Sequence, residues 1–367
     1  MELKLIKIKR LAPRLLCTIL LMAYLSFSGM AVNAKAPVNI NPTQSHDINT
    51  SFCKEDRSFS FAWLTDTQYY TSKYPDLYKL TVQYILDNRE SRNTKYVIHT
   101  GDIVDNSKKE YQWINADNCL SLLDNAKMPY GVLAGNHDVN HDKKDYSEYD
   151  RYFGEKRFCS NIWYGGSYKN NKGHYDLISA GRNDFIIVYM GWGISKAEFD
   201  WMNQVLAEHK DKTAILCFHN YLNNTGRRDF VGEEIFNNVV KRNKNVIMTL
   251  NGHYHGAARK EDKIDDDGDG VYDRTVYQIL SDYQEGPMGG GGYIRYITFD
   301  TKANKVSIST YSPYFNDYNF FNNNESRRDS YGYQDEFTYP LPLKSQSLFG
   351  WQHRITDLIP GWHKSKK

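Results

Sequence analysis

The sequence lacks an excess of charge of either sign. Its 46 Lys and Arg residues nearly balance 44 Asp and Glu residues, which leaves a formal net charge of +2. Residues 1–34 contribute five positive charges and one negative charge, so the chain without them has a net charge of −2. Nucleic-acid-binding domains usually carry a clear excess of Lys and Arg. The sequence therefore gives no signal for a nucleic-acid partner.

Long apolar runs are also scarce, and the one near the N-terminus extends from Leu15 to Val32. A cluster of five basic residues precedes it, and the small residues of "AVNAKA" follow. This order is typical of a secretory signal peptide, with cleavage expected after Ala34. An uncleaved membrane anchor is the alternative, because the run has a borderline length for a span. We expect a secreted or cell-surface protein with no stable membrane span after cleavage.

Cysteine is rare, and four cysteines remain once residues 1–34 are removed: Cys53, Cys119, Cys159 and Cys217. An exported chain can oxidise its cysteines, but four allow three different pairings. The sequence does not choose among them. Cys217 lies within an apolar run, which favours a small buried hydrophobic residue over a redox centre.

Neither an internal repeat nor a low-complexity tract divides the chain. Residues 1–34 form the expected signal peptide, and the polar residues 35–58 are interpreted as a linker. Alternating apolar runs and amphipathic stretches then predict one folded domain over residues 59–312. Residues 313–367 are rich in Tyr and Asn and end in a basic "GWHKSKK", which indicates an irregular C-terminal extension.

Five short apolar runs predict strands that are buried on both faces. They are "FSFAWLTD", "KYVIHTGD", "PYGVLAGNHD", "TAILCFHN" and "NVIMTLNGH". Helices are expected over 195–210, where Ser195 and Glu198 form a capping box, and over 231–243. Two further regions, 174–192 and 293–313, have the pattern of hairpins. The expected fold is a layered α/β structure with mixed sheets and helices on their outer faces.

Each of the five runs ends in side chains that can bind a metal ion. In chain order these are Asp66 and Gln68, Asp102, Asn136 and His137, His219, and finally His253 and His255. Sites in open α/β sheets form beyond the carboxyl ends of the strands. A single His or Asp is usually structural, but five strand ends in succession predict a shared metal site.

These motifs resemble those of the calcineurin-like metallophosphoesterase superfamily. Its pattern is DxH, GDxxD, GNHD or GNHE, a single His, and GHxH, each near a strand end. Here the last four are "GDIVD", "GNHD", His219 and "GHYH", while the first is altered to "DTQ". The gaps also fit, with 36 residues from Asp66 to Asp102 and 34 from Asp102 to Asn136. The resemblance covers roughly residues 59–311.

The resemblance implies a four-layer α/β/β/α sandwich with a two-metal site at the strand ends. Asp102 would bridge two divalent ions, Mn, Fe, Mg or Zn. The first-metal set would be completed by Asp66, Gln68 and His255, and the second-metal set by Asn136, His219 and His253. A hydroxide held between the ions would attack phosphorus. The remaining implied roles fall to His137, as acid or oxyanion stabiliser, and to Asp138, which would orient the His137 imidazole.

Gln68 stands where the family pattern has a histidine. Its amide oxygen is a neutral, hard donor that ligates Mn²⁺, Mg²⁺, Fe²⁺ or Ca²⁺ weakly. This substitution should loosen the first ion and leave the second intact. The alternative is a degenerate site that binds one ion or none.

At Asp105 the sequence differs from the pattern of one subfamily, the purple acid phosphatases. Purple acid phosphatases carry a tyrosine three residues after the "GD" aspartate, and Asp105 occupies that place in "GDIVD". The resemblance therefore favours a divalent phosphoesterase over a ferric one.

The stretch "DDDGDGVYD" matches the first half of a calcium loop. Asp265, Asp267 and Asp269 stand at positions one, three and five, and Asp273 stands at nine. Position twelve is Val276, so the loop is not a complete EF-hand. It predicts a structural calcium ion, and the alternative is an acidic hairpin tip.

Taken together, the sequence predicts an exported, metal-dependent enzyme that hydrolyses small phosphate esters, with phosphodiesters favoured. An extracellular nucleotidase or phosphomonoesterase is one alternative. A calcium-stabilised surface-binding protein with a vestigial site is another. The natural substrate and the oligomeric state are not encoded in any motif of this sequence.

Overall fold

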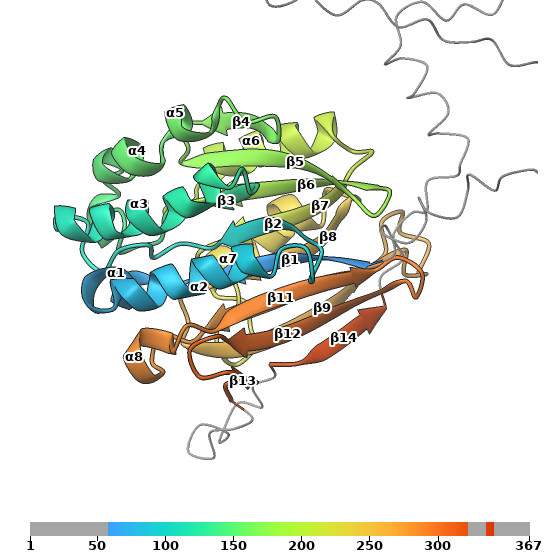
Figure 1. Cartoon of the computed structure of the whole chain (residues 1–367). Coiled ribbons are helices and arrows are strands. Elements are labelled where there is room, and N and C mark those ends of the chain that lie inside the picture. The colour runs from blue at the N-terminus through green and yellow to red at the C-terminus, as the bar shows by residue number, and fades with distance from the viewer. Residues whose placement is uncertain (1–57, 322–334, 341–367) are drawn as a thin grey trace, which may run out of the picture. The chain divides into compact units, whose positions relative to one another are not determined.

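The structure is a computed structural model that describes residues 58–321 and 335–340. The signal peptide predicted over residues 1–34 and all but the last residue of the linker predicted over 35–58 lie outside this range, as do Cys53 and the basic C-terminal residues, whereas Ser58 begins the first strand. The described residues form two seven-stranded mixed β-sheets with helices packed against them (Figure 1).

The first sheet has the strand order β13-β12-β11-β1-β2-β3, and β14 pairs with β12 as well. Strands β1, β2 and β3 run parallel, and the remaining pairs are antiparallel. Its strands are β1 (Ser58–Leu64), β2 (Thr94–His99), β3 (Tyr130–Val132), β11 (Ile294–Asp300), β12 (Lys305–Ser312), β13 (Asp317–Tyr318) and β14 (Phe337–Pro340).

The second sheet has the order β4-β5-β6-β7-β8-β10-β9. Its central strands β6, β7, β8 and β10 are parallel, while β4, β5 and β9 join it through antiparallel pairs. Its strands are β4 (Tyr164–Tyr168), β5 (Gly173–Ala180), β6 (Asn183–Met190), β7 (Thr213–Phe218), β8 (Val246–Asn251), β9 (Gly256–Ile264) and β10 (Arg274–Asp282).

Helices connect β1 to β2, β2 to β3, β6 to β7 and β7 to β8, as βαβ connections between parallel strands require, and other helices lie where the chain passes from one sheet to the other. The helices are α1 (Gln68–Lys73), α2 (Pro75–Asp87), α3 (Glu110–Asn125), η1 (His141–Lys143), α4 (Ser147–Phe153), α5 (Glu155–Phe158), α6 (Lys196–Glu208), α7 (Phe230–Ile235), η2 (Phe236–Val240) and α8 (Pro287–Gly290). The capping box predicted at Ser195 and Glu198 is confirmed at the start of α6.

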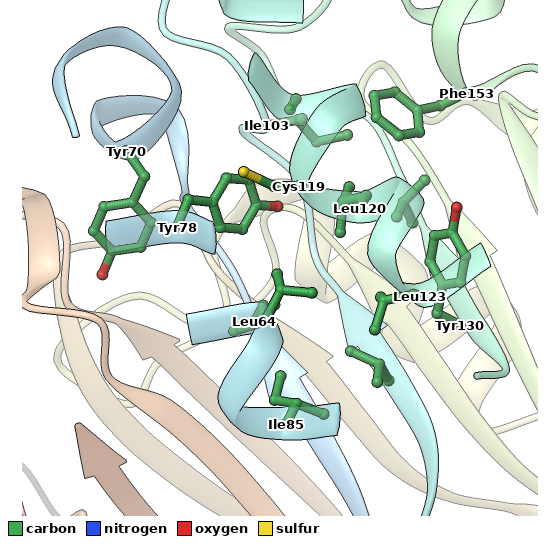
Figure 2. Close-up of a cluster of buried hydrophobic side chains, with 14 of the residues drawn as sticks. Leu64, Tyr70, Tyr78, Ile85, Ile103, Cys119, Leu120, Leu123, Tyr130 and Phe153 are labelled. Carbon is green, nitrogen blue, oxygen red and sulfur yellow. The ribbon is translucent and has the colours of Figure 1, made fainter. Parts of the chain in front are cut away.

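Three buried apolar clusters separate the layers. The central cluster contains Phe61 and Ile98 from the first sheet and Ile187 from the second, so it fills the space between the sheets. A second cluster joins the outer face of the first sheet to α2 and α3, and Figure 2 shows part of it, including Leu64 of β1 and Ile85 of α2. A third lies between the second sheet and helices α6 and α7. The predicted α/β class with two mixed sheets is confirmed.

The C-terminal end of this fold extends beyond the boundary expected at residue 312. Strands β13 and β14 both follow that residue and both pair with β12. The sheet therefore includes residues that the sequence pattern assigned to an irregular extension. Such short strands carry too few residues for an alternation to be recognised.

Cys119, Cys159 and Cys217 are free thiols, so no disulfide joins any two cysteines of the described residues. Cys217 is fully buried within the central cluster, which confirms it as a small core residue. Among residues 58–321 and 335–340, no helix combines the length and the apolar character needed to cross a membrane.

Candidate metal centre

The predicted ligands follow the carboxyl ends of parallel strands. Asp66 follows β1, Asp102 follows β2, and Asn136 follows β3 in the first sheet. In the second sheet, His219 directly follows β7 and His253 follows β8. Because parallel strands end at the same edge of a sheet, both sheets deliver these side chains to one place.

Three of these residues have a strained backbone. Asp66 and Asp102 both have φ of 52°, and His253 has φ of 74°. Non-glycine residues adopt this left-handed region uncommonly and such residues cluster at functional sites, but loop residues such as Lys127 and Lys169 adopt it here as well. The positive φ angles of the three residues fit a functional site, and the side-chain geometry supplies the evidence for it.

Asp102, His219 and His253 form the centre of the site, with one potential ligand atom of each lying within 4.8 Å of the others. His219 donates from Nδ1 to the Thr100 carbonyl oxygen at 2.9 Å, which leaves Nε2 as the atom facing the site. His219 Nε2 lies 3.3 Å from Asp102 Oδ2 and 2.9 Å from Asn136 Oδ1. A neutral His219 would present a lone pair to two oxygens, and a cation between them removes this repulsion.

Two glycines leave room for the carboxylates of the site. A Cβ atom on Gly135 would overlap the Asp102 carboxylate, and a Cβ atom on Gly252 would overlap the Asp66 carboxylate. Any side chain at either position would displace a predicted ligand. This explains why glycine precedes Asn136 and His253 in the two motifs.

The first-metal set is built around Gln68, the first residue of α1. Its side chain is buried, and its Nε2 donates to Gln284 Oε1 and, at 3.4 Å, to Asp102 Oδ2. Gln68 Oε1 is buried without any hydrogen-bond partner. A buried acceptor without a donor is costly unless another group satisfies it, and a metal ion can do so.

The other two members of the first-metal set differ in exposure. Asp66 is buried, and its carboxylate accepts the His253 backbone N–H at 3.1 Å. His255 lies at the rim, with 42% of its side chain exposed, and its Nδ1 is 2.6 Å from Glu285 Oε1. A carboxylate that binds one imidazole nitrogen orients the other nitrogen for a metal ion.

Burial and charge shift the pKa values of the site in opposite directions. Burial and the nearby Asp282 raise the pKa of Asp66 well above its usual range. Burial would also raise the pKa of Asp102, but His219 outweighs it and lowers the value to about 2. Burial and the adjacent His219 lower the pKa of His253 to about 3. Crowded carboxylates beside histidine imidazoles are a donor set that fits divalent cations.

His137 lies next to the cluster formed by Asp102, His219 and His253 but is not a member of it. Its Nδ1 donates to the Asp105 backbone carbonyl at 2.7 Å, and its Nε2 lies 3.9 Å from Asp102 Oδ2. The side chain is 29% exposed, so the imidazole can be reached by a bound molecule.

Asp138 was expected to orient the His137 imidazole, and the hydrogen bonds correct this expectation. The buried Asp138 carboxylate instead accepts three backbone N–H groups, from Ile103 at 3.1 Å, Val104 at 2.9 Å and Gly135 at 2.7 Å. It joins the loop after β3 to the loop after β2. Asp105, through its backbone carbonyl, is the residue that fixes the imidazole.

Sequence reasoning missed three residues next to the first-metal set: Asp282, Gln284 and Glu285. Asp282 is the last residue of β10, a further parallel strand of the second sheet, and Gln284 and Glu285 follow it. The signal was present, because "VYQILSD" is another apolar run that ends in an acid. It was overlooked because none of these residues belongs to the motifs that carry the resemblance.

The acidic stretch after β9 forms the tip of the β9–β10 hairpin. One carboxylate oxygen from each of Asp265, Asp267 and Asp269 lies within 4.8 Å of the others, as a calcium loop would require. The Asp273 carboxylate instead accepts the Asp266 backbone N–H at 2.6 Å. The loop is therefore an acidic hairpin tip, and it also holds three carboxylates close enough together to bind one ion.

Comparison with known proteins agrees with this geometry. A model of the calcineurin-like phosphoesterase family matches residues 59–257. The chain is 53% identical over 286 residues to a protein of Bacillus subtilis (strain 168) named "Uncharacterized protein YvnB". The match covers 78% of this chain and 22% of that protein, so the chain spans about a fifth of the relative's length.

Solved structures with similar folds include a dimetal phosphatase from Danio rerio, with 14% identity and a TM-score of 0.47 over 69% of this chain and 95% of that one. A purple acid phosphatase from yellow lupin (Lupinus luteus) has the same identity and TM-score over 77% of this chain and 53% of that one. The family model, in contrast, covers more than half of the chain and includes every motif from Asp66 to His255. The chain belongs to the calcineurin-like phosphoesterase family.

Proposed function

We propose that this protein is an exported phosphoesterase that uses two divalent metal ions and prefers phosphodiesters to phosphomonoesters. The observation that carries the proposal is the convergence of strand ends from both sheets around Asp102. The family match supports the class of reaction. The choice of substrate, the number of metal ions and the export of the protein are our proposals.

In this proposal Asp102 is shared by the first-metal and second-metal sets. Three features of the site fit two cations: the partnerless Gln68 Oε1, the clearance at Gly135 and Gly252, and the crowding of buried carboxylates. When bound, such ions act as Lewis acids on a phosphoryl oxygen and acidify the water that attacks phosphorus.

His137 then acts on the bound ester. Because Nδ1 donates to the Asp105 carbonyl, Nε2 is the nitrogen that faces the substrate. There it donates to a phosphoryl oxygen or protonates the leaving group. Asp138 has no direct part in this chemistry and holds the two loops on which Asp102 and His137 lie.

The test is hydrolysis of an aryl phosphodiester and its monoester by chelated protein to which Mn²⁺, Mg²⁺, Fe²⁺, Zn²⁺ or Ca²⁺ is returned singly. We expect at least one metal to restore turnover, with a higher kcat/KM for the diester. A higher value for the monoester would instead favour a nucleotidase or phosphomonoesterase. If the wild type hydrolysed neither ester with any of the metals, a vestigial site would be favoured.

His137→Ala should lower kcat by about 10² to 10⁴-fold without loss of bound metal, because general acid catalysis contributes on this scale. His209→Ala serves as the control, because His209 lies at the end of α6 and contacts Tyr175. Full activity of His137→Ala would contradict the role given to this imidazole.

The proposal includes a structural calcium ion at Asp265, Asp267 and Asp269. Their clustered oxygens and the oxygen preference of calcium support it. Ca²⁺ should raise the melting temperature of the wild type and leave that of Asp267→Asn unchanged. Equal shifts in both proteins would mean an acidic hairpin tip without an ion.

A further inference from the structure

Three buried polar side chains form a hydrogen-bonded series that ends at the first-metal set. Asp282 Oδ1 accepts the Gln284 backbone N–H at 2.9 Å, and Asp282 Oδ2 accepts Gln284 Nε2–H at 3.0 Å. Gln284 Oε1 in turn accepts a hydrogen bond from Gln68 Nε2. The exposed fractions of Asp282, Gln284 and Gln68 are 1%, 6% and 1%. We name this series the amide relay.

The amide relay has a direction, because its members differ in what they can donate. An ionised carboxylate only accepts hydrogen bonds, whereas a glutamine amide has a donor end and an acceptor end. Asp282 therefore requires the NH₂ group of Gln284, which turns Gln284 Oε1 toward Gln68. That oxygen requires the NH₂ group of Gln68, so the orientation of both amides follows from Asp282.

The consequence concerns Gln68 Oε1, the one atom of this side chain that can ligate a metal ion. Both amide hydrogens have acceptors, Gln284 Oε1 and Asp102 Oδ2, and Oε1 is left buried and without a partner. If the amide were reversed, an NH₂ group would take the place of the ligating oxygen. Fixing the orientation therefore decides whether Gln68 can act as a ligand.

We propose that Asp282 is a positioning residue that acts through Gln284 to hold the Gln68 amide oxygen toward the first metal ion. The inference rests on the two-metal centre of the proposed function and deepens it. The imidazoles of the site are oriented in a similar way, His219 by the Thr100 carbonyl and His255 by Glu285. Partners of this kind typically change metal affinity by about 10 to 100-fold.

The direction of the relay allows a test by reversal. In Asp282→Asn, the new NH₂ group favours a turned Gln284, which then draws the Gln68 oxygen away from the ion. In Gln68→Glu, a carboxylate faces Gln284 Oε1, and two acceptors oppose each other. In the double variant, residue 282 donates to Gln284, and Gln284 donates to one oxygen of residue 68. The second oxygen of residue 68 remains for the metal, and the net charge of the wild type is kept.

The measurement is Mn²⁺ titration of chelated protein, by calorimetry and by the electron paramagnetic resonance signal of spin-coupled manganese pairs. We expect two ions and a coupled signal in the wild type. Asp282→Asn should weaken the first ion by about 10 to 100-fold and leave mononuclear manganese in the second-metal set. The double variant should regain the coupled signal. Asp211→Asn, an exposed control, should behave as the wild type.

Other results would overturn the inference. If Asp282→Asn bound Mn²⁺ with the affinity of the wild type, the Asp282 carboxylate would not be what orients the Gln68 amide. Loss of the first ion without recovery in the double variant would make Asp282 a direct ligand. If Asp282→Asn does not fold, Gln284→Met interrupts the relay and should weaken the first ion in the same way. A wild type that binds no Mn²⁺ would refute the two-metal centre itself, and the inference with it.

Discussion

At the scale of single residues, His219 and Asp102 form a closely coupled pair in the site. Burial opposes a charged imidazole, but the adjacent Asp102 carboxylate outweighs it and raises the pKa of His219 from 6.5 to about 10. The pKa of Asp102 moves in the opposite direction, from 3.8 to about 2. In the metal-free protein a proton on His219 therefore occupies the place of a cation.

This coupling predicts how the stability of the metal-free protein depends on pH. Because the folded pKa of His219 exceeds its ordinary value, its contribution is fully present below pH 6.5 and is lost as the pH rises toward 10. The contribution of Asp102 is present above pH 3.8 and is lost as the pH falls toward 2. We expect the melting temperature of chelated protein to fall between pH 6.5 and 10.

Metal should weaken this dependence, since the ion replaces the proton on His219. Melting curves of Mn²⁺-loaded protein over the same pH range should therefore have a shallower slope. His219→Asn without metal should lack the wild-type slope as well. Identical slopes for the chelated and loaded wild type would contradict the exchange of proton for metal.

The residues of the site were predictable where a local motif carries them. Asp102, His219 and His253 each follow an apolar run, so chain position alone indicated that they would meet. The roles of Asp138 and Asp282 were not predictable, because a buried carboxylate takes its role from partners that only the folded chain brings near. Asp138 accepts hydrogen bonds from the backbone N–H groups of residues 103 and 104, which lie more than 30 positions away, so no local sequence pattern indicates these contacts.

At the scale of elements, Asp138 joins the ends of β2 and β3. Asp138→Asn replaces one accepting oxygen by an NH₂ group that faces a backbone N–H donor. Leaving a buried donor without an acceptor costs about 1–3 kcal/mol. We expect the free energy of unfolding of metal-free protein to fall by about 2 kcal/mol in urea titrations.

Asp142→Asn provides a matched control, because Asp142 is exposed within η1. That variant should stay within about 0.5 kcal/mol of the wild type. Equal stability of the two variants would show that the three hydrogen bonds of Asp138 do not hold the loops.

Elements differed in how visible they were in the sequence. Central strands such as β7 and β8 appear as continuous apolar runs because both of their faces are buried. By contrast, β4 reads "YGGSY" and is half-buried throughout, so glycine and partial exposure hide it. The capping box of α6 was visible because its two side chains lie three residues apart.

At the scale of the whole molecule, β14 contributes side chains to the core between the two sheets, although it follows the domain boundary predicted at residue 312. Tyr339 is buried and stacks on Tyr277 with ring centroids 3.9 Å apart, and the Tyr277 hydroxyl donates to the Pro340 carbonyl at 2.6 Å. Phe337 and Tyr339 both belong to the central cluster. A strand that fills a core contributes to stability however far it lies from the motifs.

Ending the chain after Phe321 should therefore destabilise the protein by at least about 4 kcal/mol, because removing even one large buried aromatic residue costs about that much and β14 contributes two. Denaturant unfolding checks this value. A chain that ends after Pro340 retains β14 and is the control for truncation itself. Unchanged stability after Phe321 would mean that β14 adds nothing to the core.

The placement of the ligands at strand ends has a consequence for kinetics. They extend from residue 66 to residue 255, so the site cannot exist until strands from both sheets have paired. Contacts between residues so distant in sequence form late, after the cost of closing long loops. An ion bound by such contacts should slow unfolding and leave the folding rate nearly unchanged.

Stopped-flow refolding and unfolding with and without Mn²⁺ would measure both rates. A metal-dependent acceleration of refolding would show that the ion recruits its ligands early. The expected result is that chelation shortens the lifetime of the folded protein while the time needed to fold stays the same.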